Sequence, residues 1–187
     1  MLTQNPTRVN PCTVGSIMTM TLPQFERTWT RDKSDLPEGE WMREVDKAQW
    51  RDAETGLACL VVRNHVGCWC GYVGVTSEHP WWQCSYDDCD VDVHGGLTYA
   101  GWGGGGPEES RVIRYAPLED DPVEVVKERL GISSLWWFGF DCAHSGDLCP
   151  RMTRVYQQTG VYRTFAYVVD EVTILAKQVK NNAKMST

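Results

Sequence analysis

Residues 57–75 read Leu57-Ala-Cys-Leu-Val-Val-Arg-Asn-His-Val-Gly-Cys-Trp-Cys-Gly-Tyr-Val-Gly-Val75, and this stretch decides the fold. Its first seven residues are a short apolar run closed by an arginine, which is typical of a buried strand. Asn64 to Gly67 has the composition of a turn, and the apolar residues resume at Cys68. The pattern therefore predicts a β-hairpin with strands at 57–63 and 68–75.

The segment before this hairpin predicts a helix that begins near 37–40 and ends at Gly56. Helical steps of four, three and four connect Trp41, Val45, Ala48 and Asp52. Residues 1–35 are rich in Thr, Pro and Asn and lack periodicity, so we expect an irregular arm there. The globular core is expected to span 36–180.

Two further strands are predicted after the hairpin. Residues 91–99 alternate apolar and polar side chains, but the pair Gly95-Gly96 indicates a bulge or a point where another group approaches the backbone closely. Leu135 to Phe140 is apolar on both faces, which predicts a central strand. Between them, Gly101 to Pro107 reads as a flexible loop and a candidate lid.

Two helices are predicted in the second half of the chain. Asp121-Pro122 has the composition of a helix start, and Gly131 ends that helix. Apolar residues at steps of three or four predict a long C-terminal helix over 161–180, with Arg163 and Glu171 facing water. We therefore expect a single α+β domain over 1–187, a mostly antiparallel sheet packed with about three helices.

The chain of 187 residues carries a net charge of −7, and its distribution is uneven. No Lys or Arg lies between Asn64 and Ser110, so we see no basic face of the kind that binds a nucleic-acid duplex. Binding of a small anionic ligand remains an open alternative, and Arg151 and Arg163 are among the arginines that could hold it. No apolar run reaches the ~20 residues of a bilayer-spanning helix, so no membrane partner is expected.

Eight cysteines are present, but their spacing lacks the two close pairs of a zinc ribbon. The first 25 residues lack the positive-then-apolar order of a secretory signal. We therefore expect a cytoplasmic protein with reduced thiols and no disulfide framework.

Three of the four histidines lie where a loop could carry chemistry. His144 sits between Asp141 and Asp147 after the predicted central strand, His94 lies beside a glycine pair, and His79 precedes a proline. Loops at strand ends often carry function because a rigid sheet positions them. We predict that these five residues form the catalytic set and share one polar cavity.

The residue types leave two versions of this chemistry open. In one, His94, Asp141, His144 and Asp147 hold a divalent metal (Zn²⁺, Mn²⁺ or Mg²⁺), which lowers the pKa of its bound water. In the other, two histidines act as general base and general acid while a carboxylate orients one imidazole. Trp81, Trp82 and Trp102 lie in polar loops and could stack on a planar ligand. The predicted substrate-binding set is Trp81, Trp82, Thr98, Tyr99, Trp102 and Arg151.

Three motifs carry a resemblance to known sequences: Cys70-Gly-Tyr-Val-Gly-Val75 with His79-Pro80, Asp92-Val-His-Gly-Gly-Leu-Thr-Tyr99, and Gly139-Phe-Asp-Cys-Ala-His-Ser-Gly-Asp147. They resemble a family of small bacteriophage and prophage proteins over roughly 41–179. The resemblance implies a phage accessory protein in the cytoplasm of the host bacterium and assigns no residue a role.

Phage accessory proteins of this size often blunt host defences, many of which signal through cyclic or modified nucleotides. The first hypothesis is a counter-defence hydrolase, such as a phosphodiesterase, that degrades a small anionic nucleotide. The second is a protein that sequesters such a nucleotide without turnover. The third is a phage structural or interaction protein. A homo-oligomer with a pocket between subunits also remains open.

Overall fold

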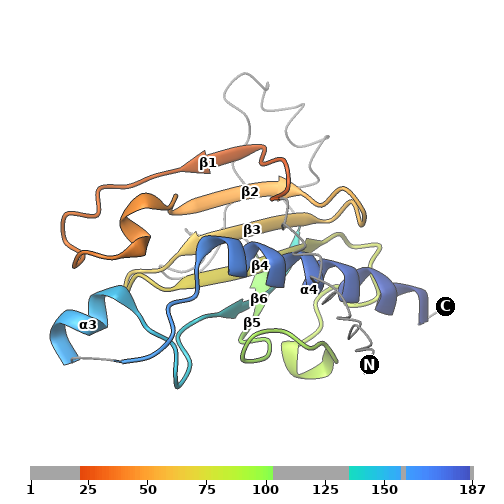
Figure 1. The fold of residues 1–187 in the computed structure, drawn as a ribbon. Coiled ribbons are helices and arrows are strands. Elements are labelled where there is room, and N and C mark those ends of the chain that lie inside the picture. The colour runs from red at the N-terminus through yellow and green to blue at the C-terminus, as the bar shows by residue number, and fades with distance from the viewer. Residues whose placement is uncertain (1–21, 103–134, 157–158, 186–187) are drawn as a thin grey trace, which may run out of the picture.

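A computed structural model describes residues 22–102, 135–156 and 159–185 of the chain. Its centre is a six-stranded sheet in the order β1-β2-β3-β4-β6-β5, in which every neighbouring pair is antiparallel (Figure 1). The strands are β1 (Arg27–Trp29), β2 (Lys47–Arg51), β3 (Ala58–Arg63), β4 (Trp69–Val75), β5 (Tyr99–Trp102) and β6 (Trp136–Asp141). With the C-terminal helix, this sheet confirms the predicted single-domain α+β fold.

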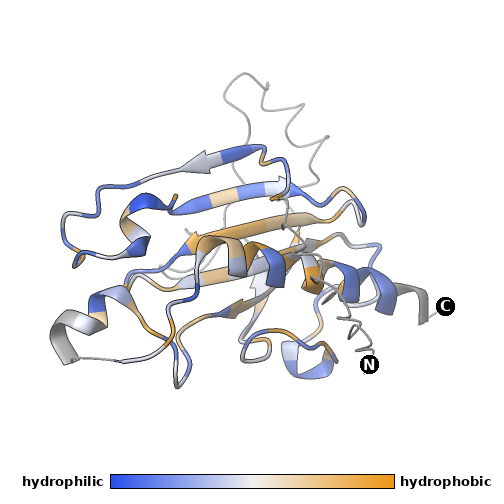
Figure 2. Cartoon of the chain, viewed as in Figure 1, coloured by the Kyte–Doolittle hydropathy of each residue, from blue (hydrophilic) through white to orange (hydrophobic). Residues whose placement is uncertain are grey.

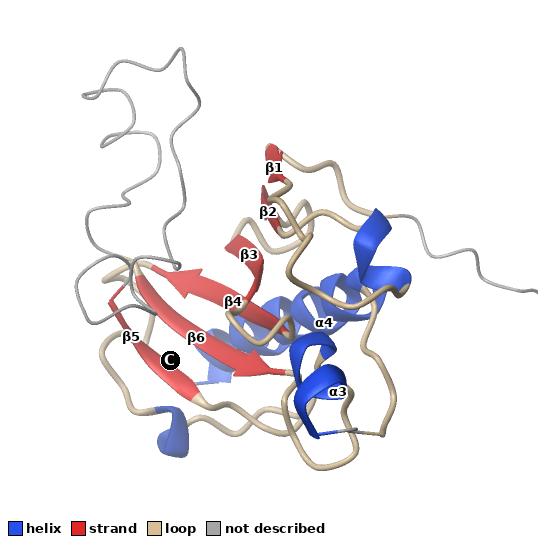
Figure 3. Cartoon of the chain, turned by 90° about the vertical axis from the view of Figure 1, so that its left-hand side faces the viewer, coloured by secondary structure: helices blue, strands red, loops and turns tan. Residues whose placement is uncertain are grey.

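Four helical segments accompany the strands. They are the short 3-10 helices η1 (Glu40–Arg43) and η2 (Tyr86–Asp88), and the α-helices α3 (Pro150–Tyr156) and α4 (Phe165–Met185). Helix α4 lies along one face of the sheet, as Figures 1 and 3 show. Its start is capped by Thr164, whose Oγ1 accepts the backbone N–H of Tyr167 at 3.3 Å. No helix among the described residues is long and apolar enough to cross a bilayer.

The central hairpin and the central strand form as predicted. β3 pairs with β4 through Leu60 opposite Tyr72, and β6 lies between β4 and β5. Figure 2 shows β3 as hydrophobic along most of its length, whereas α4 carries separate hydrophobic and hydrophilic patches. The apolar stripe of α4 that meets the sheet is Val168, Val172, Leu175, Ala176 and Val179. Gly71 of β4 allows this close approach, because a Cβ there would lie 2.5 Å from Val172.

The prediction of a helix before the hairpin is wrong. Only η1 is helical, and residues 47–51 form strand β2 between β1 and β3. Ala48 and Trp50 point into the core beneath α4. The core-facing residues of this segment therefore repeat every two residues, as in a strand, and not every 3.6 residues, as in a helix. The arm predicted at 1–35 is also too long, because β1 begins at Arg27.

Other local predictions need correction. Residues 91–98 form no strand, because a turn closes between Val93 and Gly96 (N–H to O, 2.8 Å), and β5 begins only at Tyr99. The C-terminal helix runs from Phe165 to Met185 and not over 161–180. The helix predicted from Asp121 and the part of the candidate lid at 103–107 lie outside the described residues.

One pair of cysteines is joined, contrary to the expectation of reduced thiols. Cys68, at the start of β4, forms a disulfide with Cys149, which directly precedes α3. The other cysteines in the described part of the chain are not in a disulfide; they are Cys59, Cys70, Cys84, Cys89 and Cys142. The disulfide ties the loop after β6 to the central hairpin.

Candidate functional site

The candidate site lies where three segments meet beside the end of β6. They are the turn at 93–96, the loop at 141–147 and the first turns of α4. The link between the first two is His94, whose Nε2 lies 2.8 Å from Oδ2 of Asp147. The two residues are 53 positions apart in sequence, so their contact depends on the tertiary fold.

Asp147 is the buried anion of the site, with 2% of its side chain exposed. Arg163 Nε donates to its Oδ1 at 2.8 Å, and the backbone N–H of His144 donates to its Oδ2 at 3.1 Å. Burial alone would raise the pKa of Asp147, but the hydrogen bonds from Arg163, His94 and His144 outweigh burial and hold that pKa below its ordinary value. Asp147 is therefore an ionised acceptor at neutral pH.

His94 is held at both ring nitrogens. Because ionised Asp147 can only accept, Nε2 of His94 carries the proton of that hydrogen bond. Nδ1 lies 3.0 Å from the hydroxyl of Tyr167, which donates to it when the imidazole is neutral. Carboxylate, imidazole and hydroxyl thus stand in series, which is the arrangement of an oriented general base.

Tyr167 connects this series to a second carboxylate. Burial and the neighbouring charge of Glu171 raise the pKa of Tyr167, so its hydroxyl is protonated at neutral pH. Glu171 also accepts the backbone N–H of His94 at 2.8 Å, which fixes the turn to α4. The Tyr167 ring lies beneath Arg163, whose Cζ is 5.1 Å from the ring centroid. The hydroxyl can therefore exchange hydrogen bonds with His94 and Glu171.

A second imidazole stands beside the first. The rings of His94 and His144 have centroids 5.6 Å apart. Nε2 of His144 is buried and has no hydrogen-bond partner among the described residues, and Oδ1 of Asp141 lies 3.9 Å from it. Gly95 packs directly against this nitrogen, since a Cβ at Gly95 would lie 2.0 Å from it. His144 is thus the group that approaches the glycine backbone.

An open hollow of about 400 Å³ gives access to this cluster. His94, Gly95, Tyr167 and Glu171 line it, together with Asp92. Neither Lys nor Arg is among the lining residues in the part of the chain that the structure describes. Two carboxylates therefore make the local potential negative.

The four residues predicted as metal ligands do not fit a metal site. His94 directs one nitrogen at Asp147 and the other at Tyr167, and Asp141 accepts a hydrogen bond from Thr98. No group of three or more His, Cys, Asp or Glu side chains within 22–102, 135–156 and 159–185 is placed to hold a metal ion.

His79 lies outside the cluster. Its Nε2 is 3.1 Å from the carbonyl oxygen of Val179, and its Nδ1 accepts the backbone N–H of Trp81 at 3.1 Å. Val179 follows Glu171 by eight residues, which is about 12 Å along a helix. Burial lowers the pKa of His79, which suits a neutral imidazole that braces its loop on α4.

The three loop tryptophans also lie apart from His94 and His144, although Trp81 packs edge-on against His79. Trp82 packs edge-on against Trp102, and Trp102 against Trp136, with ring centroids 5.0 and 5.5 Å apart. Trp136 begins β6 and Asp141 ends it, so about 17 Å of strand separates the two groups. Trp81 packs on the core beside β6. The predicted stacking of these rings on a ligand at the histidine site is therefore not supported.

The remaining predicted binding residues divide into two groups. Arg151 forms an ion pair with Asp35, so its side chain is engaged elsewhere. Thr98 Oγ1 donates to Oδ2 of Asp141 at 3.0 Å. Thr98, Asp141 and Tyr99 line a pocket on the sheet face opposite α4. Thr98 and Tyr99 thus adjoin the candidate site through Asp141.

Sequence reasoning missed the roles of Tyr167 and Glu171, because Glu171 was assigned to the solvent side of the helix. The available signal was a second stripe on α4 at steps of four, seven and four, namely Tyr167, Glu171, Gln178 and Asn182. Gln178 exchanges two hydrogen bonds with the backbone of Asp92, and Asn182 donates to the carbonyl of Asp90. A polar stripe of this kind indicates a docked polar loop.

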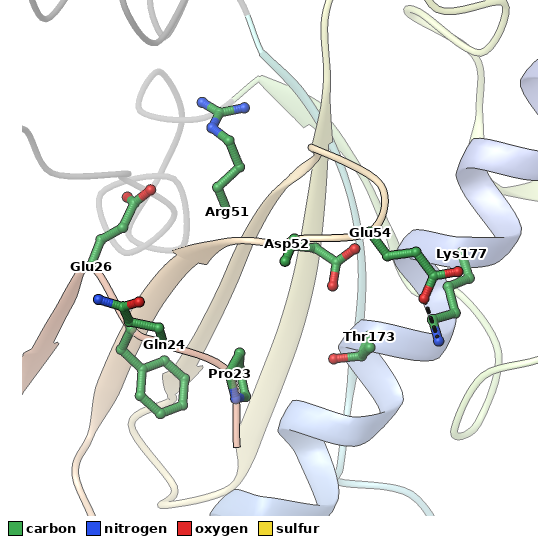
Figure 4. Close-up of a pocket in the computed structure, with 10 residues that line it drawn as sticks. Pro23, Gln24, Glu26, Arg51, Asp52, Glu54, Thr173 and Lys177 are labelled. Carbon is green, nitrogen blue, oxygen red and sulfur yellow. Dashed lines mark ion pairs between the residues drawn. The ribbon is translucent and has the colours of Figure 1, made fainter. Parts of the chain in front are cut away.

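A larger hollow of about 530 Å³ lies elsewhere, between the β2–β3 turn and α4 (Figure 4). Lys177 and Glu54 form an ion pair across it at 2.8 Å, and Arg51 donates to the carbonyl of Gly56 at 2.8 Å. Asp52 accepts two hydrogen bonds from Thr55, at 2.8 and 2.7 Å. Because these charged groups are paired locally, we assign this hollow no chemistry.

No protein family, no curated protein and no solved structure matches the chain.

Proposed function

We propose that this protein is a metal-independent hydrolase of a nucleotide-like phosphodiester, with His94 as its general base. The proposal is supported by the series Asp147–His94–Tyr167, whose hydrogen-bond distances are 2.8 and 3.0 Å. His144 supplies a second imidazole 5.6 Å from the first, between centroids. Two imidazoles at this spacing can serve the attacking and leaving oxygens of one phosphorus atom.

The proposed step needs only water and these side chains. The water oxygen attacks phosphorus and forms a new P–O bond, while the bond to the leaving oxygen breaks. The water proton passes to Tyr167 as Tyr167 gives its own proton to Nδ1 of His94. Asp147 stabilises the imidazolium that results. His144 donates a proton from Nδ1 to the leaving oxygen, since its Nε2 is buried against Gly95. Solvent exchange restores both imidazoles.

The charge of the substrate requires a positive partner, because Asp92 and Glu171 line the hollow. We assign this role to Arg163, which does not line the hollow itself but lies over the ring of Tyr167, which does. Its Nε is committed to Asp147, and neither Nη atom has a partner among the described residues. The planar guanidinium can offer these remaining N–H groups to phosphate oxygens. Arg163 would then hold the substrate and Asp147 together in one network.

A different observation favours a second, non-catalytic function. The backbone N–H and both ring nitrogens of His94 have partners, and the loop at 90–94 is tied to α4 through Glu171, Gln178 and Asn182. A protein that only binds a nucleotide, or a structural phage protein, needs such ties but no titrating group. In that case His94 serves to hold the loop in place.

Incubation with a panel of cyclic mono-, di- and trinucleotides in excess EDTA, followed by chromatography, tests the proposal. We expect turnover of at least one compound, at a rate that EDTA does not change. Binding without turnover would favour sequestration, and turnover that EDTA abolishes would contradict the metal-independent mechanism.

The setting of this activity is also a proposal. On the resemblance of its motifs we propose a phage accessory protein of the host bacterial cytoplasm. The disulfide between Cys68 and Cys149 is the observation that speaks against a reducing compartment.

A further inference from the structure

The pocket on the sheet face opposite α4, which we call the sheet-face pocket, has no role in the mechanism above. Its volume is about 440 Å³, within the range of small-molecule sites. Asp141 and Ala143 of the loop after β6 form one side of it, and Val66 of the β3–β4 turn lies among its other lining residues. The pocket therefore borders the same loop that carries His144.

The pocket has aromatic walls. Tyr72 of β4 and Tyr99 of β5 face it from the strands on either side of β6, with their rings edge-on and centroids 5.8 Å apart. Gly139 lies opposite both tyrosines in the pairing register and leaves room for them, since a Cβ there would lie 2.2 Å from Tyr72. Flat rigid rings of this kind suit a planar ligand.

Among the polar groups that border these walls, Asp141 offers an acceptor and Asn64 a donor, and the imidazole of His65 also lines the pocket. Asp141 accepts the Oγ1–H of Thr98 and the backbone N–H of Ala143, both at 3.0 Å. A carboxylate offers about four lone-pair positions, so two remain for a ligand N–H. Asn64 uses its Oδ1 on the backbone N–H groups of Val66 and Cys68. Its amide nitrogen, with only a 3.8 Å contact to a thiol, is therefore the donor on the pocket side.

The charges of its lining residues do not suit this pocket to binding phosphate. In the described part of the chain, its lining includes neither Lys nor Arg. The imidazole of His65 is the one basic group among these lining residues. A phosphate bound here would face Asp141 with neither Lys nor Arg as a counter-charge, which is unfavourable. A neutral planar group with an N–H beside an acceptor, such as a nucleobase, matches both the charge and the hydrogen-bonding groups.

We propose that the sheet-face pocket binds the base of the substrate, with Asp141 accepting from its N–H groups and Tyr72 and Tyr99 flanking its ring. This inference rests on the proposed hydrolase. Oδ1 of Asp141 lies 3.9 Å from Nε2 of His144, so a base held here places the attached sugar and phosphate toward the histidines. The protein then recognises a nucleotide at two adjoining sites, one for the base and one for the phosphate.

Calorimetric titration with the four ribonucleosides tests the inference, because a nucleoside has a base and no phosphate. We expect saturable binding of at least one nucleoside and none of inorganic phosphate at the pocket. Val66→Trp, which fills the pocket, should weaken nucleoside binding at least 10-fold. The matched control Ala53→Trp, in the hollow of Figure 4, should leave it unchanged.

The outcomes separate this inference from the proposed function. Nucleoside binding that is intact in His94→Gln while turnover is lost supports both. Nucleoside binding without turnover in the wild-type protein upholds the pocket and contradicts the hydrolase. Turnover without nucleoside binding, or wild-type binding by Val66→Trp, overturns the pocket. If Val66→Trp does not fold, Tyr99→Leu takes its place, with the same expected loss.

Discussion

His94 reaches across 53 residues of sequence to place its Nε2 2.8 Å from Oδ2 of Asp147. The same carboxylate accepts a hydrogen bond from Arg163, which lies two residues before the start of α4. One buried anion therefore joins the turn at 93–96, the loop after β6 and the segment that leads into α4. Whether these contacts serve proton transfer or only hold the loop decides the function.

Replacing Asp147 with Asn should destabilise the protein in a pH-dependent way. The folded-state pKa of Asp147 is lowered, so its stabilising contribution is complete above the unfolded pKa of about 4 and is lost as pH falls through the folded value. We expect Asp147→Asn to lower the free energy of unfolding by about 2–3 kcal/mol at pH 7. Urea denaturation at pH 7 and at pH 3 measures this, and an equal loss at both values would contradict it.

The two glycines beside His94 should differ in their tolerance of a side chain. Gly95 has φ +68°, and a Cβ there would strike His144, whereas Gly96 has φ +80° and open space around it. We expect Gly96→Ala to cost about 1 kcal/mol, through the backbone alone. Gly95→Ala should cost at least about 1 kcal/mol more, because the imidazole must move. Thermal unfolding of the pair provides the comparison, and equal losses would show that His144 is not packed on Gly95.

Removing the Tyr167 hydroxyl should slow turnover more than it affects the fold. Tyr167→Phe breaks the series between His94 and Glu171 and keeps the ring beneath Arg163. We expect a loss in kcat of about 10- to 100-fold. Tyr86→Phe, at an exposed tyrosine of η2, is the control and should retain wild-type kcat. If Tyr167→Phe also retains it, the proton does not pass through this hydroxyl.

The disulfide between Cys68 and Cys149 should be a major source of stability. Its two cysteines are 81 positions apart in sequence, a separation for which loop-closure entropy corresponds to about 4–5 kcal/mol. We expect Cys149→Ser to lower the melting temperature and to make it insensitive to reductant. Cys84→Ser, at a free and half-buried cysteine, should retain the wild-type response to reductant. Recovery of a reduced Cys149 peptide from the native protein by mass spectrometry would show that the bridge is absent.

The parts of the fold that could be predicted from sequence are those set by local pattern. The β3–β4 hairpin has its apolar runs, its turn and its period within 19 residues, so no distant information is needed. β2 was predicted as helix because a chance spacing from Trp41 to Asp52 matched 3.6 residues per turn. Its strand state comes from pairing with β1 and β3, which no local pattern encodes.

The candidate site could be predicted in part, because some of its residues also have a recognisable local pattern. His94, Asp141, His144 and Asp147 were selected as polar residues in loops at strand ends, and the sheet brings those loops together. His79 has the same local character but contacts the other end of α4. Tyr167 and Glu171 were missed because a helical polar stripe reads as solvent-facing unless the loop that covers it is known.

The most direct test of the proposed acid–base role of His94 is the turnover rate of His94→Gln, compared with wild type, on the cyclic nucleotides of the panel. Glutamine retains hydrogen-bonding groups that can brace the turn but cannot act as a base at neutral pH. We predict that kcat falls by about 10²- to 10⁴-fold while the melting temperature stays within a few degrees of the wild-type value. A rate within threefold of wild type in a folded variant would show that His94 only holds the loop.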